Sequence, residues 1–213
     1  MKKTLYLKFL LAYVIFGIFG FIIISVFVPK LTVEQLTREK ANTLYSEATL
    51  IADRYGSGLY TSDTSLESVK NQLDALSVYL DSDIWIINPS GRMVLTTEYP
   101  LNVDEVVIIE NFDPTLTANS YYNVSNFFDY YDEAMLNVIA PITTNYKVNG
   151  YVVIHASMAS VYESSNSLLT ISYITMCILF FLSMIILIFF TEIVYKPLRK
   201  ITYATEQYAS GNM

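Results

Sequence analysis

Two long apolar runs without charges divide the chain. Residues 9–28 carry no charge, and a second uncharged run over 164–191 is apolar from residue 168 onward. Twenty helical residues rise about 30 Å, which is the thickness of the hydrocarbon core of a bilayer. We therefore expect the following arrangement: a cytoplasmic terminus at 1–8, transmembrane helices at 9–28 and 168–191, a domain at 29–167 and a second flank at 192–213.

The polar region after the first run begins with two helical patterns. Apolar or small residues recur on one stripe between residues 33 and 55, which predicts a long helix that continues the first span. Gly56 and Gly58 end this pattern. Thr64 and Glu67 then have the spacing of a capping box, and valine and leucine follow at steps of three and four as far as Leu80. This second pattern predicts a helix that covers a core.

From residue 84 the apolar positions follow strand patterns. Residues 84–87 and 93–95 are short apolar runs, and the Asn88-Pro-Ser-Gly segment between them predicts a hairpin with a loop of four residues. Residues 136–142 and 151–156 predict two more strands, with Asn149-Gly150 as the turn pair. Residues 98–133 are irregular by pattern. A fifth strand is expected near 120–128, and a helix from about residue 157 leads into the second run.

The charges suggest how the chain crosses a membrane. Residues 29–167 hold seven Lys or Arg against eighteen Asp or Glu, whereas both flanks of the apolar runs are basic. Because short Lys- and Arg-rich segments stay in the cytoplasm, both termini are expected inside the cell and residues 29–167 outside. A cleaved signal peptide is the alternative for the first run. That run exceeds the usual apolar core of about 7–15 residues, and no small-x-small cleavage site follows it.

Composition also limits the chemistry. The chain has one histidine, His155, and one cysteine, Cys177, which lies in the second apolar run. A zinc cluster and a disulfide within the outer domain are therefore excluded. We expect no catalytic residue, no metal and no cofactor, and His155 is interpreted as a structural strand residue. The acidic outer domain argues against a nucleic-acid partner.

An aromatic patch in the irregular region is the candidate ligand site. Aromatic faces beside carboxylates suit a cation or an amine, and a sheet-filling role is the alternative. Arg92, after the hairpin turn, is a candidate for facing a carboxylate ligand, and a solvated turn residue is the alternative. The candidate ligand-binding residues are Tyr121, Tyr122, Phe127, Phe128, Asp129, Tyr130, Asp132 and Arg92.

The outer domain resembles the single Cache, or extracellular PAS-like, sensor domain of bacterial receptors. Two fragments carry the resemblance: the hairpin Ile84-Trp-Ile-Ile-Asn-Pro-Ser-Gly-Arg-Met-Val-Leu, and Ile139-Ala-Pro-Ile followed by Gly150-Tyr-Val-Val-Ile. The resemblance covers about residues 30–165 and implies an α+β fold, in which a long N-terminal helix packs on an antiparallel sheet of about five strands.

The segment after the second run is similar to the first helix of a HAMP linker. Leu198, Ile201, Thr205 and Tyr208 have heptad spacing, which suits a parallel coiled coil with a second copy of the chain. A basic anchor at the lipid surface is the alternative. Because the sequence stops at Met213, where the connector of a HAMP linker is expected, we expect a fragment of a longer receptor. The residues matching the HAMP pattern are Pro197, Leu198, Ile201, Ala204, Tyr208 and Gly211.

Together these features predict the sensor half of a membrane receptor. The expected partners are the bilayer, a second copy in a parallel homodimer, an unknown extracellular stimulus or small ligand, and a response regulator reached through a histidine kinase output domain. The alternatives are the sensor half of a chemoreceptor or cyclase, and a non-signalling, membrane-anchored binding domain. A surface enzyme would need a convergent polar site in the outer domain.

Overall fold

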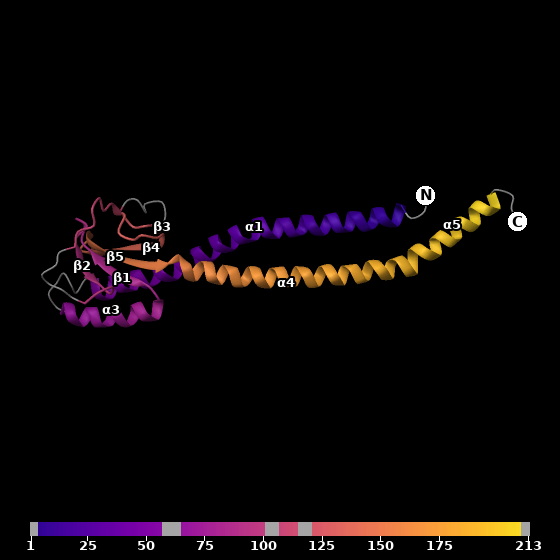
Figure 1. Ribbon diagram of the computed structural model, residues 1–213. Helices are drawn as coiled ribbons and strands as arrows, with labels where there is room; N and C mark the ends of the chain where they lie inside the picture. Colours follow the sequence, from indigo (N-terminus) through magenta and orange to yellow (C-terminus); the bar gives the residue numbers. More distant parts are fainter. Residues whose placement is uncertain (1–3, 57–64, 101–106, 115–120, 210–213) are drawn as a thin grey trace. The chain divides into compact units, whose positions relative to one another are not determined.

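The computed structural model describes residues 4–56, 65–100, 107–114 and 121–209, which form helices and one antiparallel sheet (Figure 1). The chain divides into two compact units, residues 31–165 and residues 1–30 together with 166–213. The elements are α1 (Thr4–Ile51), η1 (Ala52–Gly56), α3 (Leu66–Leu80), β1 (Asp83–Ile87), β2 (Met93–Thr96), β3 (Tyr122–Ser125), β4 (Met135–Thr144), β5 (Lys147–Ser157), α4 (Met158–Phe190), η3 (Thr191–Tyr195) and α5 (Lys196–Ala209).

Five strands form the sheet, in the order β2-β1-β5-β4-β3, and each pairs antiparallel with its neighbours. The expected α+β fold, with a long N-terminal helix on a five-stranded antiparallel sheet, is therefore confirmed. The strand expected near 120–128 is β3, and the predicted hairpin is β1 with β2.

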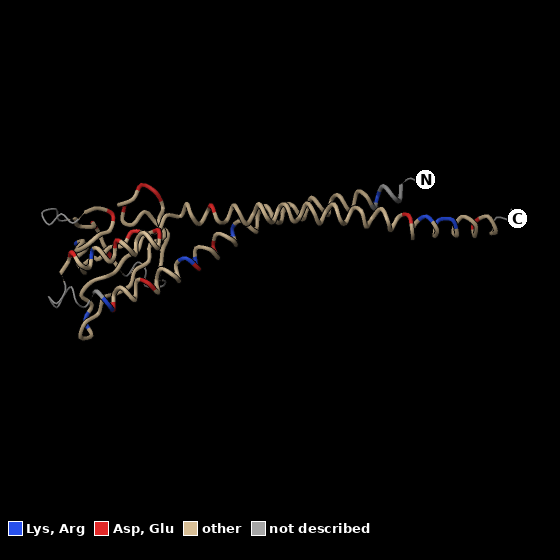
Figure 2. The backbone as a smooth tube through the Cα atoms, turned by 90° about the horizontal axis from the view of Figure 1, so that it is seen from below, with Lys and Arg blue, Asp and Glu red and all other residues tan. Residues whose placement is uncertain are grey.

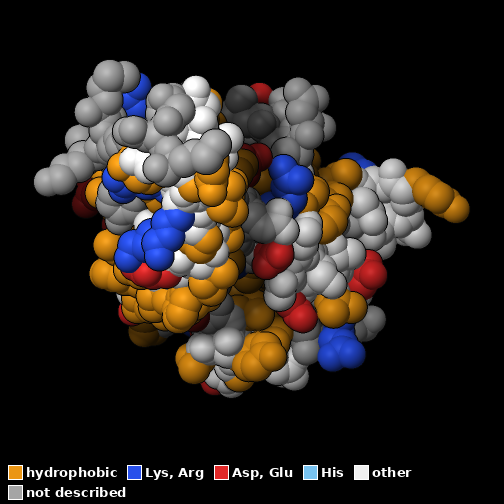
Figure 3. Space-filling model, turned by 90° about the vertical axis from the view of Figure 1, so that its right-hand side faces the viewer, with side chains coloured by type: hydrophobic (Ala, Val, Ile, Leu, Met, Phe, Trp, Pro, Cys, Tyr) orange, Lys and Arg blue, Asp and Glu red, His pale blue; other side chains and the backbone are white. Residues whose placement is uncertain are grey.

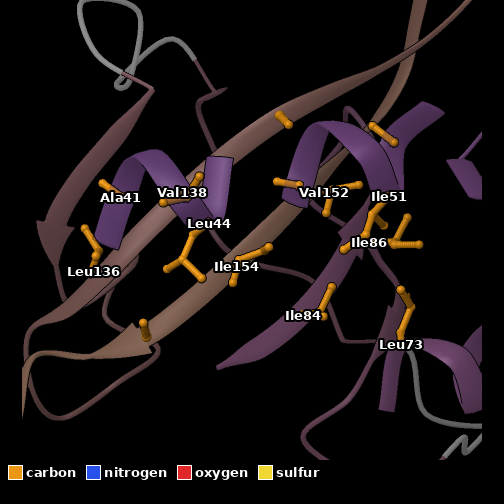
Figure 4. Close-up of a cluster of buried hydrophobic side chains, with 14 of the residues drawn as sticks. Ala41, Leu44, Ile51, Leu73, Ile84, Ile86, Leu136, Val138, Val152 and Ile154 are labelled. Carbon is orange, nitrogen blue, oxygen red and sulfur yellow. The ribbon is translucent and has the colours of Figure 1, made fainter. Parts of the chain in front are cut away.

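The inner face of the sheet packs on α1 and α3 through aliphatic side chains, which we call the inner core (Figure 4). Every second residue of β1 and β5 points to this face because successive side chains of a strand alternate. Ala41, Leu44 and Ile51 of α1 are at most 2% exposed, and Leu73 of α3 closes the side near β1. Burying such side chains is the main stabilising term for this unit.

Two local predictions were wrong. The N-cap of α3 is Ser65, whose hydroxyl accepts from the Ser68 backbone N–H at 3.3 Å, while Thr64 lies outside the described residues. The turn between β4 and β5 is Asn145-Tyr146, both with positive φ, and not Asn149-Gly150. A two-residue turn of this kind matches the twist of the strands, and the extra Asn149 becomes a bulge within β5.

The second unit contains the apolar parts of α1 and α4. By length and composition both helices could cross a membrane, and Figure 2 shows long stretches of each without charged residues. Their apolar side chains are exposed, with Phe16 74% and Phe181 65% exposed. Figure 3, which faces the end of the chain that carries the termini, shows Lys and Arg side chains beside such hydrophobic surface.

The two apolar helices of this unit contact each other. The Tyr13 hydroxyl donates to the Phe180 carbonyl at 2.7 Å, and the two rings stack with centroids 5.1 Å apart. A Cβ on Gly17 would lie 2.3 Å from the Phe180 ring, so the glycine provides the space for that ring. Small residues commonly allow this close approach between helices in a bilayer.

Candidate functional site

The outer face of the sheet carries a cluster of aromatic rings in place of aliphatic side chains. Trp85 of β1 and His155 of β5 are both fully buried, and their ring centroids lie 4.3 Å apart. Phe127 approaches His155 to 4.4 Å and Tyr131 approaches it to 5.2 Å, while Tyr130 meets Trp85 edge-on at 4.6 Å. We call these five residues the aromatic cluster.

Strand alternation and register bring the two central rings together. Trp85 is flanked in β1 by Ile84 and Ile86, which point to the inner core, so its own ring points outward. In β5, His155 is likewise flanked by Ile154 and Ala156, which belong to the inner core. The pairing of Asp83 with His155 then places the histidine diagonally from Trp85, within reach of an aromatic side chain.

A strained turn covers the cluster. Phe127, Phe128 and Asp129 have φ of 46°, 56° and 60°, a conformation that residues other than glycine rarely adopt. The turn is held by the burial of Phe127, by the Tyr131 N–H bonding to the Asn126 carbonyl at 3.1 Å, and by the Asn126 side-chain amide bonding to Asp129 at 2.6 Å. Backbone strain of about 1–3 kcal/mol per residue concentrates at ligand sites and switch regions.

A second segment crosses the turn of the β1–β2 hairpin. The Ile109 N–H donates to the Gly91 carbonyl at 2.9 Å, which holds residues 107–112 beside the aromatic cluster. Gly91 has φ of +79°, and a Cβ there would lie 2.8 Å from the Ile109 carbonyl oxygen. Between the two covering segments lies a groove of about 380 Å³, lined by Ile108, Ile109, Glu110, Asn111, Phe128, Asp129 and Tyr130.

The cluster contains polar atoms that have no hydrogen-bond partner. Within the described residues, Trp85 Nε1, Tyr131 Oη and His155 Nε2 are buried and unpartnered. A buried polar group without a partner costs about 1–3 kcal/mol, so three on contacting rings are unusual for a purely structural core. Burial also lowers the pKa of His155 to about 3, so its imidazole is neutral at physiological pH.

Two carboxylates give the site a negative potential. Burial and the nearby Asp81 raise the pKa of Asp83. Partial burial and the charge of Asp83 raise the pKa of Glu98, although the hydroxyl of Tyr130, which donates to Glu98 at 3.2 Å, acts in the opposite direction. The pKa of Tyr131 is raised above its ordinary value by burial and by these two carboxylates. Cations and neutral groups are therefore favoured over anions here.

The structure separates the predicted ligand residues into two groups. Phe127, Phe128 and Tyr130 lie at the outer face with Tyr131. Tyr121 and Tyr122 pack instead against the inner core, where the Tyr121 ring contacts Tyr45 of α1 and its hydroxyl donates to Asn42. The side chains of Asp129, Asp132 and Arg92 are exposed, and the backbone of Arg92 bridges to Ile108. A ligand role for these residues stays a prediction.

The HAMP-like residues lie on α5. Leu198, Ile201 and Tyr208 are 57%, 65% and 74% exposed, so their stripe has no partner helix among the described residues. Ala204 lies between them, and Gly211 lies outside the described residues. Pro197 follows the π-helical turn η3, which fits a residue that cannot donate a backbone hydrogen bond. The HAMP-like signal-transmission role of these six residues stays a prediction.

Sequence reasoning missed the centre of the site. Trp85 and His155 were each interpreted as strand residues, because they lie far apart in the sequence and only the β1–β5 pairing joins them. The available signal was that the single tryptophan and the single histidine both occupy outward positions of apolar strands. Among the described residues, no group of three or more His, Cys, Asp or Glu side chains could hold a metal ion.

Comparison with known proteins finds sensor domains. No family model matches the chain, and no curated protein matches it significantly. The sensor domain of the Vibrio cholerae histidine kinase DctB is similar at 14% identity and a TM-score of 0.44, covering 64% of this chain and 57% of that one. The Campylobacter jejuni chemoreceptor Tlp3 ligand-binding domain, in complex with L-valine, matches at 10% identity and 0.45, covering 63% and 60%.

A third similar structure is the extracellular domain of the putative histidine kinase vpHK1S-Z8, at 15% identity and a TM-score of 0.39, covering 67% of this chain and 60% of that one. The chain thus spans less than two thirds of the length of each of these structures. The three structures are domains of a histidine kinase, a chemoreceptor and a putative histidine kinase.

Proposed function

We propose that the chain is the sensory part of a membrane receptor, which detects an extracellular stimulus with residues 31–165 and passes a conformational change to a cytoplasmic output domain. The observation that carries this proposal is the continuity of β5 with α4. His155 lies in the aromatic cluster, β5 ends at Ser157, and α4 begins at Met158 with no loop between them. A displacement of β5 at the site therefore acts directly on the helix that holds the second apolar run.

The first helix offers a second connection. Tyr121, next to β3, hydrogen-bonds to Asn42 of α1, and the Lys40 ammonium group of α1 donates to the Ser160 hydroxyl of α4 at 2.9 Å. Sensor movement can therefore alter the contact between α1 and α4 within residues 31–165. Helix shifts of about 1–2 Å are sufficient to switch packed assemblies between two states.

In this proposal α1 and α4 cross the plasma membrane, both termini are cytoplasmic, and α5 pairs with the same helix of a second copy. The basic residues that follow the second apolar run favour a cytoplasmic position for α5. The exposed stripe of Leu198, Ile201 and Tyr208 favours a parallel coiled coil, because apolar side chains at heptad spacing bury against an identical partner. The output is a histidine kinase that signals to a response regulator.

Disulfide crosslinking in native membranes tests the dimer. With Cys177 replaced by serine, single cysteines at Leu198, Ile201 or Thr205 should form disulfide-linked dimers under mild oxidation. A cysteine at Tyr203, on the opposite side of α5, is the matched control and should pair several-fold less. Equal pairing at all four positions, or pairing at none, would remove the support for a signalling coiled coil.

A further inference from the structure

The polar atoms on the rings of the aromatic cluster define a specific hydrogen-bonding pattern. The Asn137 side-chain amide, on β4, lies beside His155 and fixes its tautomer. Its nitrogen faces only acceptors, namely the Asn123 side-chain oxygen at 3.0 Å, the Ser125 carbonyl at 3.0 Å, the Ser125 hydroxyl at 3.1 Å and the Met135 carbonyl at 3.2 Å. The amide oxygen of Asn137 must therefore face His155, at 2.7 Å from Nδ1.

This arrangement decides which imidazole nitrogen accepts. Because the Asn137 oxygen can only accept, the proton of the neutral imidazole sits on Nδ1 of His155, and Nε2 keeps a lone pair. That lone pair is buried and has no hydrogen-bond partner in the part of the chain that the structure describes. The Trp85 Nε1–H group is a hydrogen-bond donor, and the Tyr131 hydroxyl can either donate or accept a hydrogen bond. The three rings therefore present one acceptor, one donor and one adaptable group.

We propose that Trp85, Tyr131 and His155 form a binding site for an uncharged ligand group that both donates and accepts a hydrogen bond, such as a carboxamide. The group donates to His155 Nε2 and accepts from Trp85 Nε1–H, and so satisfies buried atoms that otherwise cost free energy. A carboxylate cannot donate to Nε2, and Asp83 and Glu98 repel it. This ligand class rests on the sensory role proposed above.

Access to the site requires movement of the strained turn. Trp85 and His155 are fully buried, and Phe127 lies against both. Phe128 and Asp129 of this turn line the groove of about 380 Å³, so relaxing the left-handed backbone of residues 127–129 would open the cluster toward that groove. Ligand binding would thus move the residues next to Ser125. Ser125 is linked to His155 through hydrogen bonds of the Asn137 side chain.

Two reporters at the site allow a direct test on the full chain in lipid nanodiscs. Trp85 is the only tryptophan and His155 the only histidine, so tryptophan fluorescence and ¹⁵N-histidine NMR each report this site alone. The probes are acetamide and acetate, which have nearly the same shape but differ in charge and in donors. We expect acetamide to shift both signals with a dissociation constant of about 1 mM or weaker, as is usual for such small ligands.

The outcomes separate clearly. Acetate should bind at least about tenfold more weakly than acetamide. Y131F should weaken acetamide binding about three- to tenfold. The control variant Y79F, on the exposed face of α3, should leave acetamide binding unchanged. Free protein should show the imidazole proton on Nδ1. Equal binding of acetate, no response to acetamide, or a proton on Nε2 would overturn this ligand class. Crosslinking of α5 is measured without ligand, so its failure would count against the receptor proposal separately.

Discussion

The two faces of the sheet differ in what their side chains require. The inner core is aliphatic, and Leu44, Ile154 and their neighbours need only close packing. The aromatic cluster on the outer face holds a neutral histidine and, within the described residues, three unpartnered polar atoms under a strained turn. Stability therefore resides mainly on the inner face, whereas the unpartnered polar groups of the outer face cost some stability, which the ligand proposed above would restore.

The largest effect is expected from truncating the inner core. Leu44→Ala removes a side chain that is 2% exposed between α1 and the sheet, and should lower the free energy of unfolding by about 2–5 kcal/mol. Leu50→Ala, on the exposed side of the same helix at 56% exposure, is the matched control and should change it by less than about 0.5 kcal/mol. Denaturant unfolding followed by Trp85 fluorescence measures both. Equal losses would contradict the assignment of the inner face.

Acidification should act on the outer face through His155. Its pKa falls from 6.5 in the unfolded chain to about 3 in the fold, so below pH 6.5 the unfolded state binds a proton that the folded state refuses. Stability should decrease as the pH falls from 6.5 toward 3, with a slope approaching about 1.4 kcal/mol per pH unit.

Asp83 and Glu98 oppose this trend at the acidic end of the range. Their pKa values are raised in the fold, so the folded state takes up their protons more readily than the unfolded state does. The pH dependence of His155→Asn, measured by the same unfolding assay, isolates the histidine contribution. If the free energy of unfolding of that variant fell between pH 6.5 and 5 as steeply as in the wild type, His155 would not be the titrating group.

The glycine of the hairpin turn, where residues 107–112 cross it, should have an intermediate effect. Gly91→Ala places a Cβ 2.8 Å from the Ile109 carbonyl oxygen on a backbone with φ of +79°, and should cost about 1–3 kcal/mol. Displacement of residues 107–112 should also change the fluorescence emission of Trp85, because Ile109 packs against the aromatic cluster. Ser90→Ala, on the exposed turn, serves as the control. Wild-type stability in Gly91→Ala would contradict the close approach.

The smallest effect has the opposite sign. Tyr131→Phe removes a buried hydroxyl that has no hydrogen-bond partner among the described residues, and it keeps the ring against His155. Without ligand, this variant should be more stable than the wild type by about 0.5–1 kcal/mol, because the cost of the unpartnered group is gone. Thermal unfolding in the absence of any ligand measures the change. A loss of more than about 1 kcal/mol would mean that the hydroxyl is partnered in solution, and that the outer face resembles the inner one.

Most secondary structure could be predicted because local patterns encode it. The helical stripe through Ala41, Leu44 and Ala48 and the continuous apolar runs of β1 and β5 each follow from which positions must be buried. The turn at Asn145-Tyr146 was missed because its conformation depends on strand register, which no local pattern specifies. Tyr121 and Tyr130 were grouped by sequence proximity, although the chain between them passes from one face of the sheet to the other.

The sequence alone determined the two apolar helices, the acidic domain between them and the strands of its sheet, since hydrophobic spacing and charge act locally along the chain. Tertiary structure decided which residues meet. Only the pairing of β1 with β5 brings Trp85 to His155, and only the β4–β5 register places Asn137 where its amide fixes the imidazole tautomer. Hydrogen bonds require atoms within about 3 Å, and contacts between distant segments are set by register and packing.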